Sequence, residues 1–247
     1  MNDESRAVHE RLARIEELLT KSPEGAATVP AWRRRTQVEG RGAVSLAVLV
    51  AIVLQLVLPD RLAIHPRWLL PGLEFLLLVA LLPATPSRAR EMGPLLRAGG
   101  LSLACAVSVA NGWSALRLIQ HLVRGTAGSD AHALLLGAAS IWITNVIVFA
   151  LWYWEWDRGG PVARASGEDD TPDFLFPQMQ SPDPVHHEWE PDFADYLYVS
   201  FTDATAFSPT DTMPMTRWAK LLMAFQAMVS LLTLALVVAR SVNILKG

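Results

Sequence analysis

The chain has 247 residues, of which 51% are hydrophobic, and its net charge is -3. This apolar excess is gathered in blocks, which is typical of a membrane protein and not of a soluble domain. The basic residues form no stripe, so nucleic acid is not an expected partner. As the only cysteine, Cys105 cannot form an internal disulfide or a cysteine-based zinc site, and its place in an apolar run predicts a packing role.

The first 42 residues combine an amphipathic helix with a basic linker. Between Ser5 and Lys21, apolar residues recur at helical spacing with Arg and Glu between them, which predicts a helix that lies on a surface or self-associates. The charged start has no apolar region followed by a cleavage site, so it does not resemble a signal peptide. The arginines of the linker are Arg33, Arg34, Arg35 and Arg41.

Five apolar blocks follow, each close to the length that about 30 Å of hydrocarbon requires. The predicted spans are Ala43–Leu58, Trp68–Pro83, Gly100–Val123, Ala133–Trp154 and Thr216–Leu245. The predicted fold class is therefore all-α: a polytopic membrane protein with a three-helix region over 43–125 and a second membrane region over 131–247. The Ala-, Arg-, Leu- and Val-rich composition favours a bacterial inner membrane.

The fourth block ends in an aromatic collar of the kind found where helices meet lipid headgroups. From Asp157 to Asp195 the chain then has ten Asp or Glu, two Arg and six Pro. This composition predicts a solvated acidic loop or lid over 157–192. Within it, Phe174–Phe176 and Met179 are apolar enough to dock on neighbouring structure.

The adjacent histidines His186 and His187 lie in the same acidic segment, close to Glu188 and Glu190. A divalent cation could bind there, but adjacent histidines in a polar loop are most simply exposed side chains. We therefore expect no metal site and no cofactor.

Several polar residues fall within the apolar blocks, where an ionisable group is a functional candidate by default. Glu74 either pairs with Arg117 or lines a wet cavity. Arg117 and His121 share one helix face near an interface, to which both side chains can extend. Asn111 and Asn145 are expected to join helices by hydrogen bonds.

The segment before the last block begins with a helix too short to cross a bilayer. Tyr196–Ala204 is followed by irregular backbone that contains Pro209 and Asp211, and then by Pro214. Non-helical backbone at membrane depth is tolerated only where it is buried in protein or lines a water-filled cavity. A re-entrant pore helix and pore loop would meet that condition.

This arrangement resembles the pore module of the potassium-channel superfamily, which consists of an outer helix, a pore helix, a filter and an inner helix. The family pattern is Ser, then Ala-Thr-Thr-Val-Gly-Tyr-Gly-Asp, followed at fixed spacing by Pro, Thr, Trp and a basic residue. The matching positions here are Ser200, Ala204, Thr205, Asp211, Pro214, Thr216, Trp218 and Lys220. The resemblance covers 131–247 and implies a homo-oligomer, with a tetramer favoured, that conducts inorganic cations.

The filter itself departs from the family pattern. The five equivalent residues are Ala206, Phe207, Ser208, Pro209 and Thr210. Ser208 and Thr210 stand where the family has glycine, and Pro209 fixes its own φ and restricts Ser208. A ladder of carbonyls that strips an ion of water is therefore not expected. What remains is a wider hydrated vestibule, which would be lined by Asp203, Thr205, Ser208, Thr210 and Asp211.

The last block carries three polar residues, Gln226, Ser230 and Thr233, on one helical face. They form either a pore-facing stripe or a helix-packing stripe. Ser230 stands where the family often has a hinge glycine.

The charge distribution and the resemblance predict opposite orientations. The linker arginines, with Arg88, Arg90 and Arg97 two spans later, favour a cytoplasmic N-terminus. Five spans would then bring the pore loop in from the cytoplasm, whereas potassium channels have it outside. We follow the charge rule.

Three functions can be compared. The first is an oligomeric pore-loop channel, weakly selective for cations, in the lipid bilayer. The second is a non-conducting structural or signalling membrane protein that retains the pore-module fold. The third, a membrane enzyme, is not favoured, because no catalytic motif with ligand or nucleophile spacing is present.

Overall fold

The structure, a computed structural model, describes residues 30–82, 93–126, 130–167, 171–180, 188–206 and 211–246. In these ranges the protein is mostly helical. The amphipathic helix predicted over 5–21, the pair His186–His187, the linker arginines Arg88 and Arg90, and the filter residues 207–210 lie outside the described residues.

A helix coincides with each of the five apolar blocks. They are α2 (Gly42–Val57), α3 (Leu69–Leu81), α5 (Gly93–Val123), α6 (Ala131–Trp156) and α10 (Arg217–Lys246). α5 begins before the predicted Gly100, because Pro94 suits the first turn of a helix, where its missing N–H is not needed. Stretches of α5, α6 and α10 are long and apolar enough to cross a membrane, whereas α2 and α3 are shorter apolar helices.

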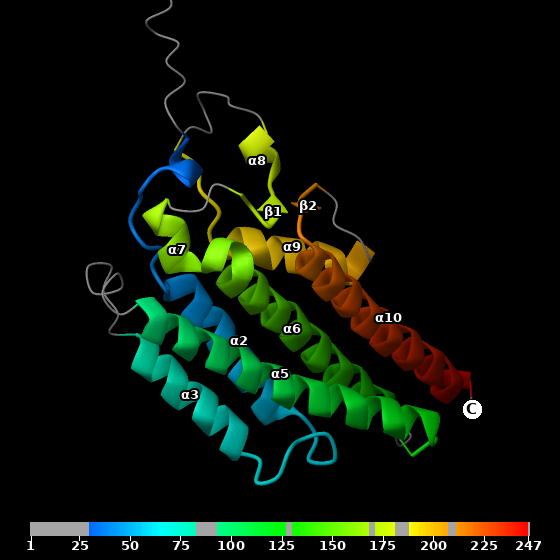
Figure 1. Ribbon diagram of the computed structural model, residues 1–247. Helices are drawn as coiled ribbons and strands as arrows, with labels where there is room; N and C mark the ends of the chain where they lie inside the picture. Colours follow the sequence, from blue (N-terminus) through cyan, green and yellow to red (C-terminus); the bar gives the residue numbers. More distant parts are fainter. Residues whose placement is uncertain are drawn as a thin grey trace, which may run out of the picture.

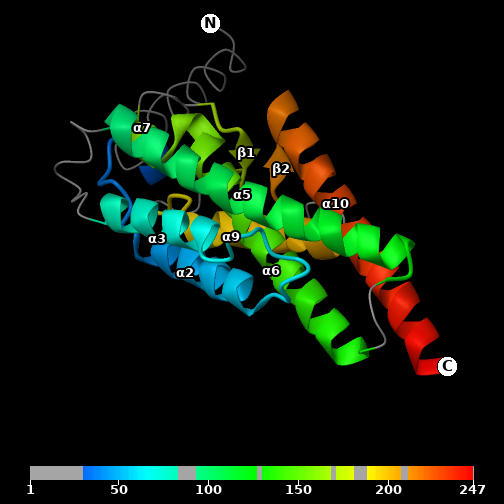
Figure 2. The same cartoon turned by 90° about the horizontal axis from the view of Figure 1, so that it is seen from below.

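α6 lies at the centre of the molecule and packs against α2, α5, α9 and α10. In both overall views α2 and α3 lie on one side of α6 and α10 lies on the other (Figure 1, Figure 2). α9 (Phe193–Ala206) is the predicted short helix, and it crosses α6 near the end where α10 begins (Figure 1). One apolar core forms where α2, α5, α6 and α9 meet, and a second joins α5, α6 and α10 towards their other ends.

Small elements gather at the α9 end of the molecule. They are η2 (Ala31–Arg33), η3 (Asp157–Gly159), α7 (Pro161–Ser166), β1 (Phe174–Leu175), α8 (Pro177–Gln180) and β2 (Met213–Pro214). β1 pairs antiparallel with β2, with Phe174 opposite Pro214. The turn between α2 and α3 and the C-terminus lie at the opposite end (Figure 1).

The chain reverses sharply after α6. Arg158 has φ 48°, and Gly159 and Gly160 follow with φ 79° and 96°. Only glycine adopts such positive angles readily, so the glycine pair makes the reversal possible.

The prediction of a solvated loop over 157–192 is wrong for its first described part. Asp157, Arg158 and Arg164 are buried, with exposed fractions of 0%, 4% and 8%. Charged side chains are buried here because they bond to one another and to backbone groups, as described below. The predicted docking is confirmed, since Phe174 and Phe176 belong to the core and Met179 packs against it.

Candidate pore-loop site

The start of α9 is capped by two aspartates. Asp192 accepts hydrogen bonds from the N–H groups of Ala194 and Asp195, at 2.9 and 3.2 Å, through its Oδ1 atom. Asp195 accepts one in return from the Asp192 N–H at 3.0 Å. This reciprocal arrangement is a capping box, and it places negative charge at the positive end of the helix dipole.

A third carboxylate reaches the same helix end from the linker before α2. Glu39 accepts hydrogen bonds from the Phe193 N–H at 2.9 Å and from the Trp154 indole N–H at 2.6 Å. Glu39 therefore ties the first turn of α9 to the end of α6. Burial raises the pKa of Glu39, and the bonds from Trp154 and Phe193 only partly oppose this.

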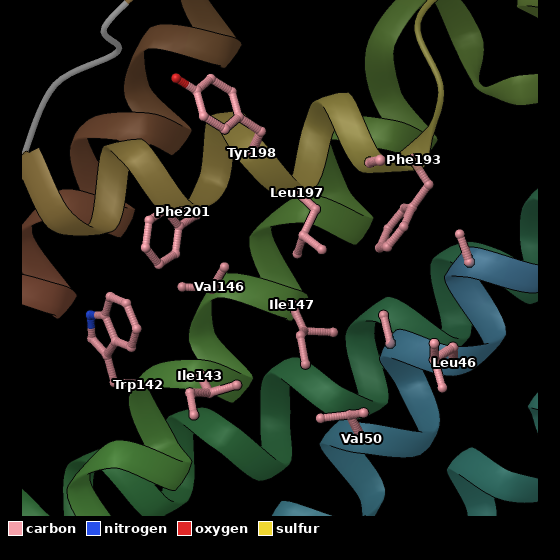
Figure 3. A pocket seen from close by; sticks show the side chains of 13 residues that line it. Leu46, Val50, Trp142, Ile143, Val146, Ile147, Phe193, Leu197, Tyr198 and Phe201 are labelled. Carbon is pink, nitrogen blue, oxygen red and sulfur yellow. The ribbon is translucent and has the colours of Figure 1, made fainter.

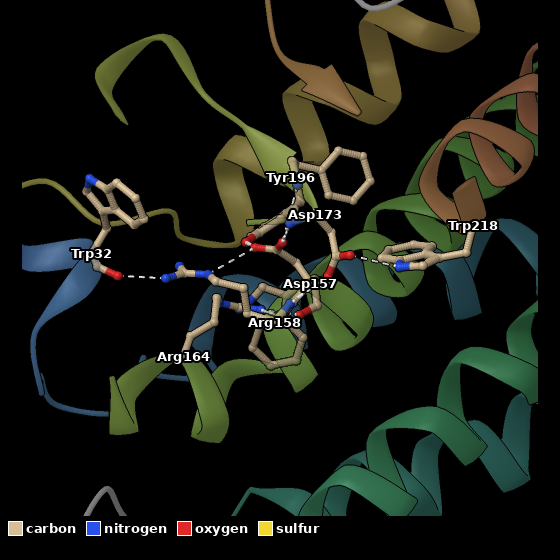
Figure 4. A network of polar contacts seen from close by, with 9 residues as sticks. Trp32, Asp157, Arg158, Arg164, Asp173, Tyr196 and Trp218 are labelled. Carbon is tan, nitrogen blue, oxygen red and sulfur yellow. Dashed lines mark hydrogen bonds and ion pairs between the residues drawn. The ribbon is translucent and has the colours of Figure 1, made fainter. Parts of the chain in front are cut away.

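Asp157 is the centre of a buried polar cluster (Figure 4). It accepts hydrogen bonds from the Tyr196 hydroxyl at 2.5 Å and from the Asp173 N–H at 2.9 Å, and it lies 3.7 Å from Arg158 Nε. Arg158 also donates to the carbonyl of Trp32 at 2.6 Å. Asp157 and Arg158 together thus join the end of α6 to α9, to β1 and to the linker.

The same cluster extends to α10 and to α7. Asp173 accepts hydrogen bonds from the Trp218 indole N–H and from the Arg158 N–H, both at 2.9 Å. Arg164 donates to the carbonyls of Trp154 and Asp157 and lies 5.1 Å from the Tyr196 ring centre. The start of α10 is therefore fixed relative to α9 by side chains of the supposed acidic loop.

The middle of α9 is held by a second, fully buried set of polar contacts. Ser200 donates to the Val146 carbonyl of α6 at 2.7 Å. Gln226 of α10 donates to the carbonyl and the hydroxyl of Ser200, both at 2.8 Å, and accepts from the Tyr153 hydroxyl at 2.5 Å. Ser200, predicted as a pore-helix residue, is thus a packing residue between three helices.

The polar stripe of α10 faces the interior of the subunit. Gln226, Ser230 and Thr233 have exposed fractions of 0%, 1% and 2%. Asn145 donates to the Ser230 hydroxyl at 3.2 Å, which confirms that it joins two helices. Of the two roles left open by the sequence, this chain uses the stripe for helix packing.

Asp203 is also buried, with an exposed fraction of 2%. Its Oδ2 atom has no hydrogen-bond partner among the described residues. An isolated buried carboxylate is stable only as the neutral acid or beside a cation. Asp203 therefore differs from the buried Asp157, whose oxygens accept from the Tyr196 hydroxyl and the Asp173 N–H.

The described residues that flank 207–210 are partly accessible. Thr205 is exposed and donates to the carbonyls of Phe201 and Thr202 in its own helix. Ala206 and Asp211 are exposed too. After them, Met215 donates to the Asp173 carbonyl at 2.8 Å, beside the β1–β2 pair. Residues 213–215 are therefore fixed at the end of the molecule where α9 begins.

The predicted ion pair between Glu74 and Arg117 is wrong. Glu74 is buried and accepts hydrogen bonds from Gln55 Nε2 at 2.9 and 3.1 Å. Arg117 lies instead near the Arg61 carbonyl, at 3.4 Å, and over the Trp113 ring. Gln55 lies on α2, next to α3, and its amide N–H groups satisfy the Glu74 carboxyl group. Glu74 therefore does not need Arg117 as a partner.

An apolar groove of about 640 Å³ runs beside α9. Figure 3 shows Leu46 and Val50 of α2, Trp142 and Ile143 of α6, and Tyr198 and Phe201 of α9 around it. No group of three or more potential metal ligands occurs in the described ranges.

Sequence reasoning missed the residues that fix α9 from outside its own helix, chiefly Glu39, Tyr153, Asp157 and Asp173. The available signals were weak: Glu39 is an acid in a basic linker, and Asp157 follows an aromatic collar. Comparison of the chain with protein-family models, curated proteins and solved structures finds no match.

Proposed function

We propose that the protein is a subunit of an oligomeric pore-loop membrane protein of the channel type, weakly selective for cations, with five spans in a bacterial inner membrane. The observation that carries this proposal is the seating of α9. A 14-residue helix lies across α6 and α10, its Ser200 side chain is buried and hydrogen-bonded between them, and the chain is at its starting end again before α10. This arrangement supports a re-entrant pore loop, whose irregular backbone would be buried in protein or would line a cavity.

In this function several copies would surround an axis beside the segment 205–211. Thr205 and Asp211 flank the constriction, and Asp203, two residues before Thr205, has an unsatisfied oxygen. A ring of carboxylates attracts cations without the dehydration that a carbonyl filter imposes. Weak cation selectivity follows from this chemistry.

One observation favours the alternative, a non-conducting structural or signalling protein. The polar stripe of α10 packs inward, and its exposed face carries apolar side chains such as Leu221, Phe225 and Met228. In a conducting oligomer such a face would form a hydrophobic constriction, whereas in the alternative it contacts lipid or a partner.

The deciding experiment combines oligomeric state with ion flux. We expect a symmetric oligomer, with a tetramer favoured, by native mass spectrometry in lipid nanodiscs, and a cation current in planar bilayers.

Asp211→Asn should lower the cation-to-anion permeability ratio, and Asp130→Asn, at the opposite end of the subunit, should leave it unchanged. A monomer, or no current at any voltage or pH, would establish the non-conducting alternative.

A further inference from the structure

A second cavity, of about 660 Å³, lies away from α9, where the linker before α2 meets the start of α5 and the segment η3–α7. Both overall views show the start of α5 beside α7 (Figure 1, Figure 2). Three arginines from separate parts of the chain line it: Arg35 and Arg41 from the linker and Arg97 from α5. The sequence predicted that these three lie on the same side of the membrane, but not that they line one cavity.

The positive charge of this cavity is only partly compensated. None of the three guanidinium groups forms an ion pair or a side-chain hydrogen bond with another residue that the structure describes. Glu155, which is buried on the same lining, is the one acidic side chain among the lining residues. Burial lowers the pKa of Arg41, and the charges of Glu155 and Glu39 oppose that shift incompletely.

Apart from Ser166, the rest of the lining is apolar or glycine. Ala98 and Leu101 continue along α5 from Arg97, and Val162 and Ala163 face them from α7. Gly93 and Pro94, at the start of the 31-residue helix α5, also line the cavity, so the positive end of the helix dipole faces it. The cavity therefore has a cationic mouth and an apolar wall that follows a helix predicted to cross the membrane.

We propose that this cavity binds the phosphate headgroup of an anionic phospholipid, with the phosphate at Arg35, Arg41 and Arg97 and the upper acyl chain along α5. Arginine matches phosphate through paired N–H donors, and basic pockets between membrane helices are suited to anionic headgroups. The inference requires a membrane location and is independent of whether the protein conducts ions.

The test measures lipid binding to the full-length protein by native mass spectrometry in detergent. The probes are phosphatidylglycerol, phosphatidylcholine and inorganic phosphate, each titrated separately. We expect phosphatidylglycerol to bind at least about tenfold more tightly than phosphatidylcholine, and Arg41→Gln with Arg97→Gln to remove most of that preference. The matched control, Arg33→Gln with Arg124→Gln, removes the same charge away from the cavity and should keep the preference.

Three outcomes would overturn the proposal. Equal losses in both double variants would mean that only overall charge matters. Equal binding of the two lipids to the wild-type protein would remove the anionic site, and saturation by inorganic phosphate as effectively as by lipid would assign the site to a free anion. If the cavity double variant does not fold, Arg35→Gln replaces it, because Arg35 is exposed; an unchanged lipid preference there would also contradict the proposal.

Discussion

Gln226 shows how one side chain can seat a short helix in an apolar environment. Its amide uses both ends: the N–H donors serve Ser200 and the oxygen accepts from Tyr153. With no water at hand, each of these groups would lose its partner if the amide were removed. This buried contact fixes the position of α9 because Gln226 joins Ser200 of α9 to Tyr153 of α6.

Gln226→Leu should therefore lower the free energy of unfolding by about 1–3 kcal/mol, the usual effect of leaving buried donors and acceptors unpaired. Chemical denaturation in detergent, followed by circular dichroism, measures it. Gln37→Leu, at an exposed linker position, is the control and should have little effect. Adding Tyr153→Phe to Gln226→Leu should cost less than the sum of the two single changes; additive losses would show that the two side chains act independently.

Asp195, at the start of α9, gives a pH dependence of stability. Burial is the main cause that raises its pKa from 3.8 to about 6; the hydrogen bond from the Asp192 N–H opposes the rise, and the charges of Asp192 and Glu39 add to it. Between these values the folded protein keeps a proton that the unfolded chain releases, so stability should fall as pH rises from about 4 to about 6 and then level off.

Asp195→Asn should remove that part of the pH dependence, because an amide keeps an acceptor for the Asp192 N–H without titrating. Thermal unfolding of both proteins between pH 4 and 8 tests this. Burial also raises the pKa of Glu39, so Glu39 adds to the pH dependence of stability in the same direction. The effect of Asp195 is therefore read from the difference between the stability-versus-pH curves of the wild-type protein and the variant. A difference that does not change with pH would contradict the shifted pKa.

At the scale of elements, two tyrosines of α9 can be compared, one buried and one exposed. Tyr196 is fully buried and donates to Asp157, whereas Tyr198, two residues later, is 52% exposed. Tyr196→Phe removes one hydrogen bond to a carboxylate and leaves the ring in place. We expect faster hydrogen exchange in the first turns of α9 and in β1.

Tyr198→Phe makes the same chemical change on the exposed face and should leave the exchange rates as they are. If both variants accelerate exchange equally, the Tyr196–Asp157 contact does not anchor α9. If neither does, Glu39 and the aspartate caps hold the helix start without it.

The positions of the long helices and of α9 could be predicted because apolar length and helix-breaking residues act locally. Ser200 and Asp203 were also selected from the sequence, through the spacing that resembles a channel pore. Their observed roles differ: Ser200 packs against Val146 and Gln226, while Asp203 is buried with one oxygen unsatisfied.

The acidic segment could not be predicted in the same way. Its charges were interpreted as solvated because composition reports how many acids are present and not which donors meet them. Asp157 is buried because Tyr196, 39 residues later, reaches it, and the partly buried Asp173 is held by Trp218. Such partners depend on tertiary packing, which no local pattern encodes.

At the scale of the whole molecule, charge distinguishes the two ends. The linker, η3, α7 and the first two turns of α5 and α10 lie at the α9 end (Figure 1), and their basic residues are Arg33, Arg34, Arg35, Arg41, Arg97, Arg158, Arg164, Arg217 and Lys220. The basic residues of the α2–α3 turn, of the end of α5 and of the last two turns of α10, towards the opposite end, include Arg61, Arg67, Arg117, Arg124 and Arg240. Because Lys and Arg near membrane helices are retained in the cytoplasm, we expect the α9 end to be cytoplasmic.

Cysteine labelling tests both this orientation and the return of the chain after α9. In a Cys105→Ser background, single substitutions Gln37→Cys, Asp211→Cys and Arg124→Cys place a thiol at exposed positions of the two ends. An impermeant maleimide should label the first two only in inverted vesicles and the third only in spheroplasts. If Asp211→Cys is labelled together with Arg124→Cys, α9 crosses the membrane and the pore-loop proposal fails. If the thiols of Gln37→Cys and Asp211→Cys both react in spheroplasts, the orientation is reversed. The re-entrant course of α9 still holds in that case, because the four helices α2, α3, α5 and α6 return the chain to the side of Gln37 before α9 begins, and Asp211 is found on that same side.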